Sequence, residues 1–185
     1  MKFVRLAFFQ AFIVSLFGTC HLDTFSRYPN QHFIETGSHE GYGIDIAVNT
    51  GFQNVYSIEI NPRLYNICKN RFDGNPRVKL FLGDSAVVLP DVIAGIDGRI
   101  TFWLDAHIAT GETGCPILEE LEAIKKHPIK DHTILIDDIR LFGTYHFDFI
   151  PVSKVIEKIL EINPRYQITY EKGHVDRDIL VAQVR

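Results

Sequence analysis

Short apolar runs alternate with stretches of mixed polarity along most of the 185-residue chain. Five of these runs predict buried strands, at residues 33–35, 54–59, 78–82, 100–104 and 133–136. The stretches that follow predict helices, at residues 44–48, 62–72, 86–96, from Pro116 onward, and 152–162. Strands that alternate with helices form parallel sheets with helices on both faces. The pattern therefore predicts an α/β domain.

The pattern changes after the last predicted helix. Residues 166–171 and 178–184 predict two strands on either side of Lys172-Gly173-His174, which is a hairpin signal. The segment 139–151 is rich in Phe, Tyr and His, and we expect it to form part of a substrate wall. Within it, Arg140 could pair with an acid or meet an anionic group of a substrate.

The N-terminal segment stands apart from this pattern. Lys2 and Arg5 precede an uncharged run over residues 6–22, which is short for a spanning helix. Three interpretations compete: a secretory signal, a weak anchor on a membrane surface, or a buried helix. We divide the chain into this segment, 1–24, and one domain, 25–185.

Composition narrows the class of protein. The hydrophobic fraction of 46% and the charged fraction of 23% are those of a globular domain. A net charge of -4 gives no reason to expect a nucleic-acid partner, because phosphate binding favours basic surfaces. The chain has three widely spaced cysteines, a pattern that argues against a disulfide framework and favours a reducing compartment.

A glycine-rich turn follows the first predicted strand. Gly37, Gly41 and Gly43 have the spacing G-x-x-x-G-x-G, which differs from the G-x-G-x-x-G of NAD-binding folds. A strand, a glycine turn and a helix N-terminus let backbone N–H groups approach a ligand closely. Glu35 lies two residues before the first glycine, which suggests a ligand with a positive end.

Glu35-Thr36-Gly37 with Gly41 and Gly43 resembles motif I of class I S-adenosylmethionine-dependent methyltransferases. The resemblance implies that the acid and the glycine loop hold the amino-acid end of the methyl donor. It extends over residues 33–184 and implies a Rossmann-like, seven-stranded, mostly parallel sheet of order 3-2-1-4-5-7-6. An ordinary strand-turn-helix with glycines for steric reasons would show the same motif.

Two further acids fit the donor site. Glu59 ends the second strand, 22 residues beyond Gly37, where a carboxylate can accept both ribose hydroxyls of a nucleoside. The alternative is a solvated glutamate at a strand end. Asp84 follows the third strand, where the resembled family has an acid beside the adenine amino group. Asp84 or Ser85 could equally cap the next helix.

A second group of acids follows the next two strands. Asp105 ends the strand 100–104, and Asp137 and Asp138 end the strand 133–136. Open α/β sheets place ligands at this edge, and converging acids repel unless a cation lies between them. Oxygen ligands favour magnesium or a similar divalent cation. The alternative is that Asp137 or Asp138 caps the next segment and Asp105 only contacts the substrate.

This acidic arrangement resembles metal-dependent O-methyltransferases of the macrolide-sugar (macrocin) and catechol types. There the metal binds two oxygens of the acceptor and positions one hydroxyl. His107 is our candidate general base, with Asp105 as a second catalytic residue, because histidine titrates near neutral pH. The catechol enzymes have a lysine three residues after the strand-end aspartate, and Ile108 replaces it here.

The resulting hypothesis is a methyltransferase acting on a small hydroxylated acceptor, such as a sugar or a vicinal diol. The alternatives are a non-catalytic donor-binding domain and another nucleoside-dependent transferase, such as an aminopropyl transferase. A cytoplasmic location, with or without membrane association, suits access to the methyl donor. The glutamates at 119, 120 and 122 are expected to form a solvated helix face.

Overall fold

Seven strands form one sheet in the computed structural model, which describes residues 22–106 and 114–184. The strands are β1 (His32–Thr36), β2 (Asn54–Glu59), β3 (Val78–Leu82), β4 (Ile100–Leu104), β5 (Thr133–Ile136), β6 (Tyr166–Glu171) and β7 (Ile179–Val184). Their order is β3-β2-β1-β4-β5-β7-β6, with β7 antiparallel to both of its neighbours and the other pairs parallel. The predicted sheet order is confirmed.

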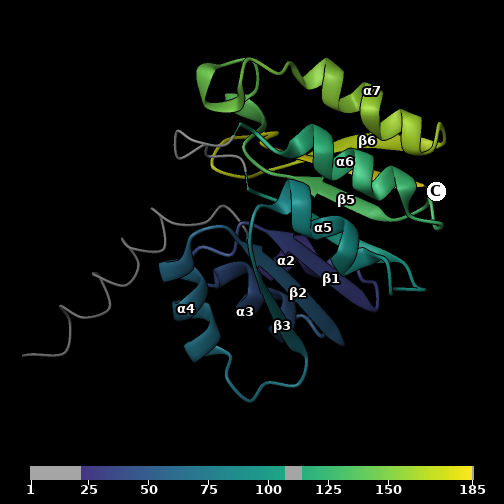
Figure 1. Ribbon diagram of the computed structural model, residues 1–185. Coiled ribbons are helices and arrows are strands. Elements are labelled where there is room, and N and C mark those ends of the chain that lie inside the picture. The colour runs from purple at the N-terminus through teal and green to yellow at the C-terminus, as the bar shows by residue number, and fades with distance from the viewer. Residues whose placement is uncertain (1–21, 107–113, 185) are drawn as a thin grey trace, which may run out of the picture.

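Helices cover both faces of this sheet (Figure 1). They are α2 (Leu22–Ser26), α3 (Tyr42–Asn49), α4 (Pro62–Arg71), α5 (Ser85–Ile93), α6 (Ile117–Lys126) and α7 (Val152–Ile162), with two short 3₁₀ turns, η1 (Ile139–Leu141) and η2 (Tyr145–Phe147). Helices α5, α6 and α7 lie side by side over one face. The other three pack on the opposite face.

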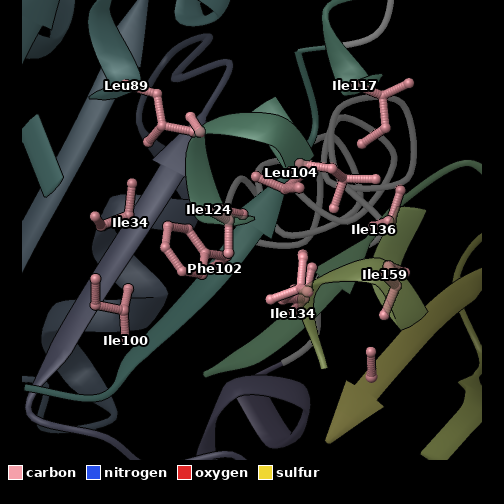
Figure 2. Close-up of a cluster of buried hydrophobic side chains, with 14 of the residues drawn as sticks. Ile34, Leu89, Ile100, Phe102, Leu104, Ile117, Ile124, Ile134, Ile136 and Ile159 are labelled. Atoms are coloured by element: carbon pink, nitrogen blue, oxygen red, sulfur yellow. The ribbon is translucent and has the colours of Figure 1, made fainter. Parts of the chain in front are cut away.

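The central strands are apolar on both sides because each face meets a helical layer. Phe33 and Trp103 pack in the cluster beneath α2 and α3, whereas Ile34 and Phe102, their neighbours in the chain, belong to the cluster beneath α5, α6 and α7. Figure 2 shows the second cluster, with strand side chains directed towards the helices that cover them. Consecutive strand residues point to opposite faces, so the fully apolar runs follow from two-sided burial.

Local signals set several helix ends. Asn61 caps α4 by accepting hydrogen bonds from the N–H groups of Arg63 and Leu64, and Pro62 occupies the first turn as expected. Helix α5 ends at Ile93 rather than at residue 96. We attribute the earlier end to Gly95, because glycine loses more conformational freedom in a helix than other residues.

The N-terminal boundary of the domain is crossed by α2. Phe25 is fully buried, and its ring centroid lies 4.6 Å from that of Phe33 and 5.2 Å from that of Trp103. Helix α2 therefore contributes Phe25 to the core, and the division into segments 1–24 and 25–185 stays a prediction. Most of the run 6–22 lies outside the described residues. Within them, no helix is long and apolar enough to span a membrane.

Candidate functional site

The carboxyl ends of β1 to β5 meet along one edge of the sheet. The register pairs Thr36 with both Ile58 and Leu104, and backbone hydrogen bonds continue past the strand ends. The N–H of Gly37 donates to Ile58 at 2.9 Å, and the N–H of Asp105 donates to Thr36 at 3.1 Å. The predicted strand-end residues are thereby brought to one edge.

The three glycines of the turn are required for different reasons. Gly37 and Gly41 have φ values of +85° and +86°, a left-handed region that favours glycine. A Cβ on Gly37 would also lie 2.7 Å from the carbonyl oxygen of Asp105. Gly43 has no such backbone requirement, but a Cβ there would lie 1.8 Å from Oε1 of Glu35. The turn is therefore closely packed against β4 and against the Glu35 carboxyl group.

Glu35 is held beneath this turn by a chain of hydroxyl groups. Ser57 Oγ donates to Glu35 Oε2 at 2.6 Å, and the hydroxyls of Ser38 and Ser57 lie 2.6 Å apart. All three residues are buried. Burial raises the pKa of Glu35 to about 8, against the effect of the Ser57 hydrogen bond, and the charge of Glu59 raises it further. A cation bound next to Glu35 would therefore favour ionisation of its carboxyl group.

The Glu59 carboxylate forms hydrogen bonds that connect the glycine turn to the end of β2. Its Oε2 accepts the backbone N–H of His39 at 2.8 Å, and its Oε1 accepts that of Asn61 at 2.8 Å. The residue is only 5% exposed, so it is not the solvated glutamate that we considered as the alternative. A carboxylate has about four acceptor positions, and two of them are used here. Its role towards ribose stays a prediction.

Asp84 lies next to Glu59 across the sheet edge. The N–H of Gly83 donates to the carbonyl of Glu59 at 2.9 Å. Asp84 is the N-cap of α5, and its Oδ1 accepts the N–H of Ala86 at 2.9 Å, so Ser85 is not the cap. Capping leaves the second oxygen of Asp84 available, and the proposed contact with adenine stays a prediction.

The acidic residues after β5 lie close to the acid that precedes β7. Ligand atoms of Asp137, Asp138 and Asp178 all lie within 4.8 Å of one another, and all three residues are buried. Asp105 is not in that group, although burial and the charges of Asp137 and Asp138 raise its pKa well above the ordinary value. Glu35 also contributes to that shift, so the two acidic sets adjoin.

Arg140 supplies a positive charge on one side of this cluster. Its guanidinium donates to Asp138 Oδ1 at 2.6 Å and also pairs with Asp178. The backbone N–H of Arg140 donates to Asp178 Oδ1 at 3.2 Å. Asp138 begins η1 in the left-handed conformation, with φ of 56°. Of the two roles that we considered for Arg140, the structure shows the ion pair with an acid.

Sequence reasoning missed two acids of this edge. Asp178 had no assigned role, although it is 1% exposed and paired with Arg140. The expectation of a solvated face at residues 119, 120 and 122 is wrong for Glu120, which is fully buried. His107, with the rest of the segment 107–113, lies outside the described residues.

The chain resembles solved methyltransferase structures in fold. An O-methyltransferase from Bacillus cereus in complex with S-adenosylhomocysteine gives a TM-score of 0.62 at 16% identity, covering 89% of this chain and 78% of that one. A TehB-like methyltransferase from Corynebacterium glutamicum gives 0.61 at 15% identity, covering 96% and 94%. A spermidine synthase in complex with a transition-state analogue gives 0.57 at 12% identity, covering 90% and 57%.

No protein-family model and no curated protein sequence matches the chain. Identities this low show the fold alone, and the same fold hosts different reactions. The chain therefore has the Rossmann-like fold of S-adenosylmethionine-dependent methyltransferases, with the sheet order expected for it.

Proposed function

We propose that this protein transfers a methyl group from S-adenosylmethionine to a hydroxyl group of a small acceptor. The observation that carries the proposal is the line of Glu35, Glu59 and Asp84 along the carboxyl edge of β1, β2 and β3, beside the glycine turn. Ligands of open α/β sheets bind at this edge. Likeness to solved methyltransferases supports it at the level of fold.

Each part of the donor has a chemically suitable partner along that edge. The ammonium group of the donor would lie near Glu35, whose raised pKa then falls as its carboxylate gains a positive neighbour. The ribose hydroxyls would use the remaining acceptor positions of Glu59, and the adenine amino group would use Asp84. Ile60 and Leu82, 44% and 48% exposed beside Glu59, offer apolar surface to the base.

Methyl transfer would follow from positioning at the adjoining acidic cluster. The acceptor oxygen attacks the methyl carbon in line with the sulfonium sulfur, the carbon–sulfur bond breaks, and the donor leaves as a neutral thioether. Asp105, at the end of β4 between the two acidic sets, would orient the hydroxyl group. His107 remains the proposed acceptor of its proton.

A divalent cation fits the charge of the cluster. Asp137, Asp138 and Asp178 lie close together, Asp105 is near enough to feel the charges of the first two, and the Arg140 guanidinium pairs only with Asp138 and Asp178 among the described residues. Buried carboxylates without compensation are costly, and hard oxygen ligands suit magnesium. Asp105, Asp137 and Asp138 would hold the ion, and Asp178 would stay with Arg140. A bound cation would lower the pKa of the acceptor hydroxyl.

Titration calorimetry with S-adenosylhomocysteine, with and without magnesium, tests donor and metal together. We expect binding in both cases, and magnesium binding that is lost in Asp137→Asn. No donor binding at millimolar concentration would reject the proposal. Product analysis with a panel of sugars and vicinal diols then separates methyl transfer from a binding domain without turnover. Incubation with decarboxylated donor and a polyamine tests aminopropyl transfer.

A further inference from the structure

Glu120 of α6 is a buried acid with a ligand-like arrangement of hydroxyl groups around it. Ser85 Oγ, in the first turn of α5, donates to Glu120 Oε1 at 2.6 Å. The glutamate is fully buried although it belongs to the N-terminal half of a charged helix. Burial of a carboxyl group is costly without hydrogen bonds, so its position calls for a specific role.

The second hydroxyl near this carboxyl group belongs to the glycine motif. Thr36, between Glu35 and Gly37, is fully buried, and its side chain lies close enough to lower the pKa of Glu120. Among the described residues, Thr36 Oγ1 and Glu120 Oε2 still lack a hydrogen-bond partner of regular geometry. Glu120 lies between these two residues, hydrogen-bonded to Ser85 and adjacent to the Thr36 hydroxyl, and is placed to bridge the end of β1 and the start of α5.

We propose that Glu120 is a positioning residue for the donor, which holds the two walls of the donor site at a fixed separation. One wall carries Glu35 and Gly37, and the other carries Asp84, directly before Ser85. The inference rests on the proposed function, because it assigns the donor to the edge between these walls. It adds a residue that would act through Thr36 and Ser85 and not by contact with the donor.

The charge of Glu120 should govern this bridge. Burial raises the pKa of Glu120 to about 7, the hydrogen bonds of Ser85 and Thr36 lower it, and the charges of Asp84 and Glu119 raise it. The Cys115 thiol is a further titratable group close enough to feel its charge. The ionised carboxylate accepts bonds from both hydroxyls, whereas the protonated form has a donor of its own and accepts less well. Donor affinity should therefore fall as the pH drops below about 7.

Calorimetric titration of the full chain with S-adenosylhomocysteine at pH 6 and pH 8 tests this role. We expect Glu120→Gln to weaken binding about tenfold at pH 8 and by much less at pH 6, because the wild-type carboxyl is already protonated there. The matched control is Glu122→Gln, on the same helix, whose side chain pairs with the exposed Lys126. It should bind like the wild type at both pH values.

The outcomes separate the two proposals. A wild-type chain that does not bind S-adenosylhomocysteine overturns the proposed function. A wild type that binds, with Glu120→Gln matching it in affinity and pH profile, overturns the positioning role alone. A purely structural role would lower the melting temperature without changing the pH dependence of binding. If Glu120→Gln does not fold, Ser85→Ala removes one donor only, and unchanged affinity and pH profile in that variant would also overturn the role.

Discussion

The carboxyl group of Glu35 fills the space that a side chain at Gly43 would need. A Cβ on Gly43 would lie 1.8 Å from Glu35 Oε1, closer than any non-bonded contact allows. The third glycine of the turn therefore serves the position of the acid and not the shape of the backbone. This relationship joins the first helix after the turn to the proposed contact with the donor.

Gly43→Ala should displace Glu35 and weaken binding of S-adenosylhomocysteine at least tenfold. The methyl group cannot be accommodated unless the carboxyl moves away from Ser57, and overpacking of this kind costs about 1–3 kcal/mol of stability. Calorimetric titration and urea unfolding measure the two effects. Gly95→Ala is the control, because nothing lies within 4 Å of a Cβ there. Wild-type affinity in Gly43→Ala would contradict the assigned position of the donor.

Donor binding should release protons from Glu35 at neutral pH. The free carboxyl has a pKa of about 8, and the donor's ammonium group favours its ionised form. Below pH 8, affinity should therefore fall as the pH falls, by at most about tenfold per unit. Titrations in two buffers of different ionisation enthalpy give the number of protons released. Glu35→Gln should release fewer protons than the wild type, and equal release would exclude this carboxyl as the source.

The acids at the carboxyl edge of the sheet could be predicted because the sequence patterns that place them are local. Glu35, Glu59 and Asp105 each end an apolar run, and parallel topology brings the ends of such runs together. Asp178 could not be found in this way. It directly precedes β7, which returns antiparallel beside β5, and only that return places it next to Arg140.

The burial of Glu120 agrees with the helical periodicity of the sequence, but the local composition predicted an exposed residue. Ile117, Leu121 and Ile124 are buried at helical spacing, and residue 120 lies on the same face as Ile117 and Ile124. Neighbouring glutamates at 119 and 122 are typical of a solvated helix start, and this composition outweighed the periodicity. Periodicity predicts which face is buried, but the hydroxyl partner that makes a buried acid tolerable comes from another helix.

Removal of Arg140 should destabilise the fold and free ligands for a metal. Arg140→Ala leaves the buried Asp178 side chain without its guanidinium, a loss expected to cost about 3 kcal/mol. Arg99→Ala removes an exposed pair with Asp131 and should cost less than about 1 kcal/mol. Urea unfolding compares the two variants. Calorimetry should also show tighter magnesium binding in Arg140→Ala, and weaker binding would mean that Arg140 supports the metal site.

Two buried histidines away from the site form a hydrogen-bonded chain. Ile100 donates its N–H to His132 Nδ1 at 3.1 Å, which leaves the proton of His132 on Nε2. That nitrogen lies 3.0 Å from His127 Nδ1, and His127 Nε2 lies 2.9 Å from the carbonyl oxygen of Ile96. The chain is complete when both rings are neutral, with their protons on Nε2.

Protonation of His132 in acid should therefore weaken the fold. Burial and the neighbouring His127 lower the pKa of His132 from 6.5 to about 4. Between these values the unfolded chain binds more protons at His132 than the folded chain, so the contribution of this histidine to stability is complete above pH 6.5 and is lost as the pH falls towards 4. The shift corresponds to about 3 kcal/mol. The raised pKa values of Glu35 and Glu120 act in the opposite direction, so the test compares variants. Urea unfolding at pH 7.5, 5.5 and 4.5 should give the same pH dependence in the wild type and in the control His174→Gln, whose side chain is exposed. His132→Gln should be less stable than the wild type at pH 7.5, and this difference should shrink on acidification. A constant difference would show that His132 does not contribute to the pH dependence.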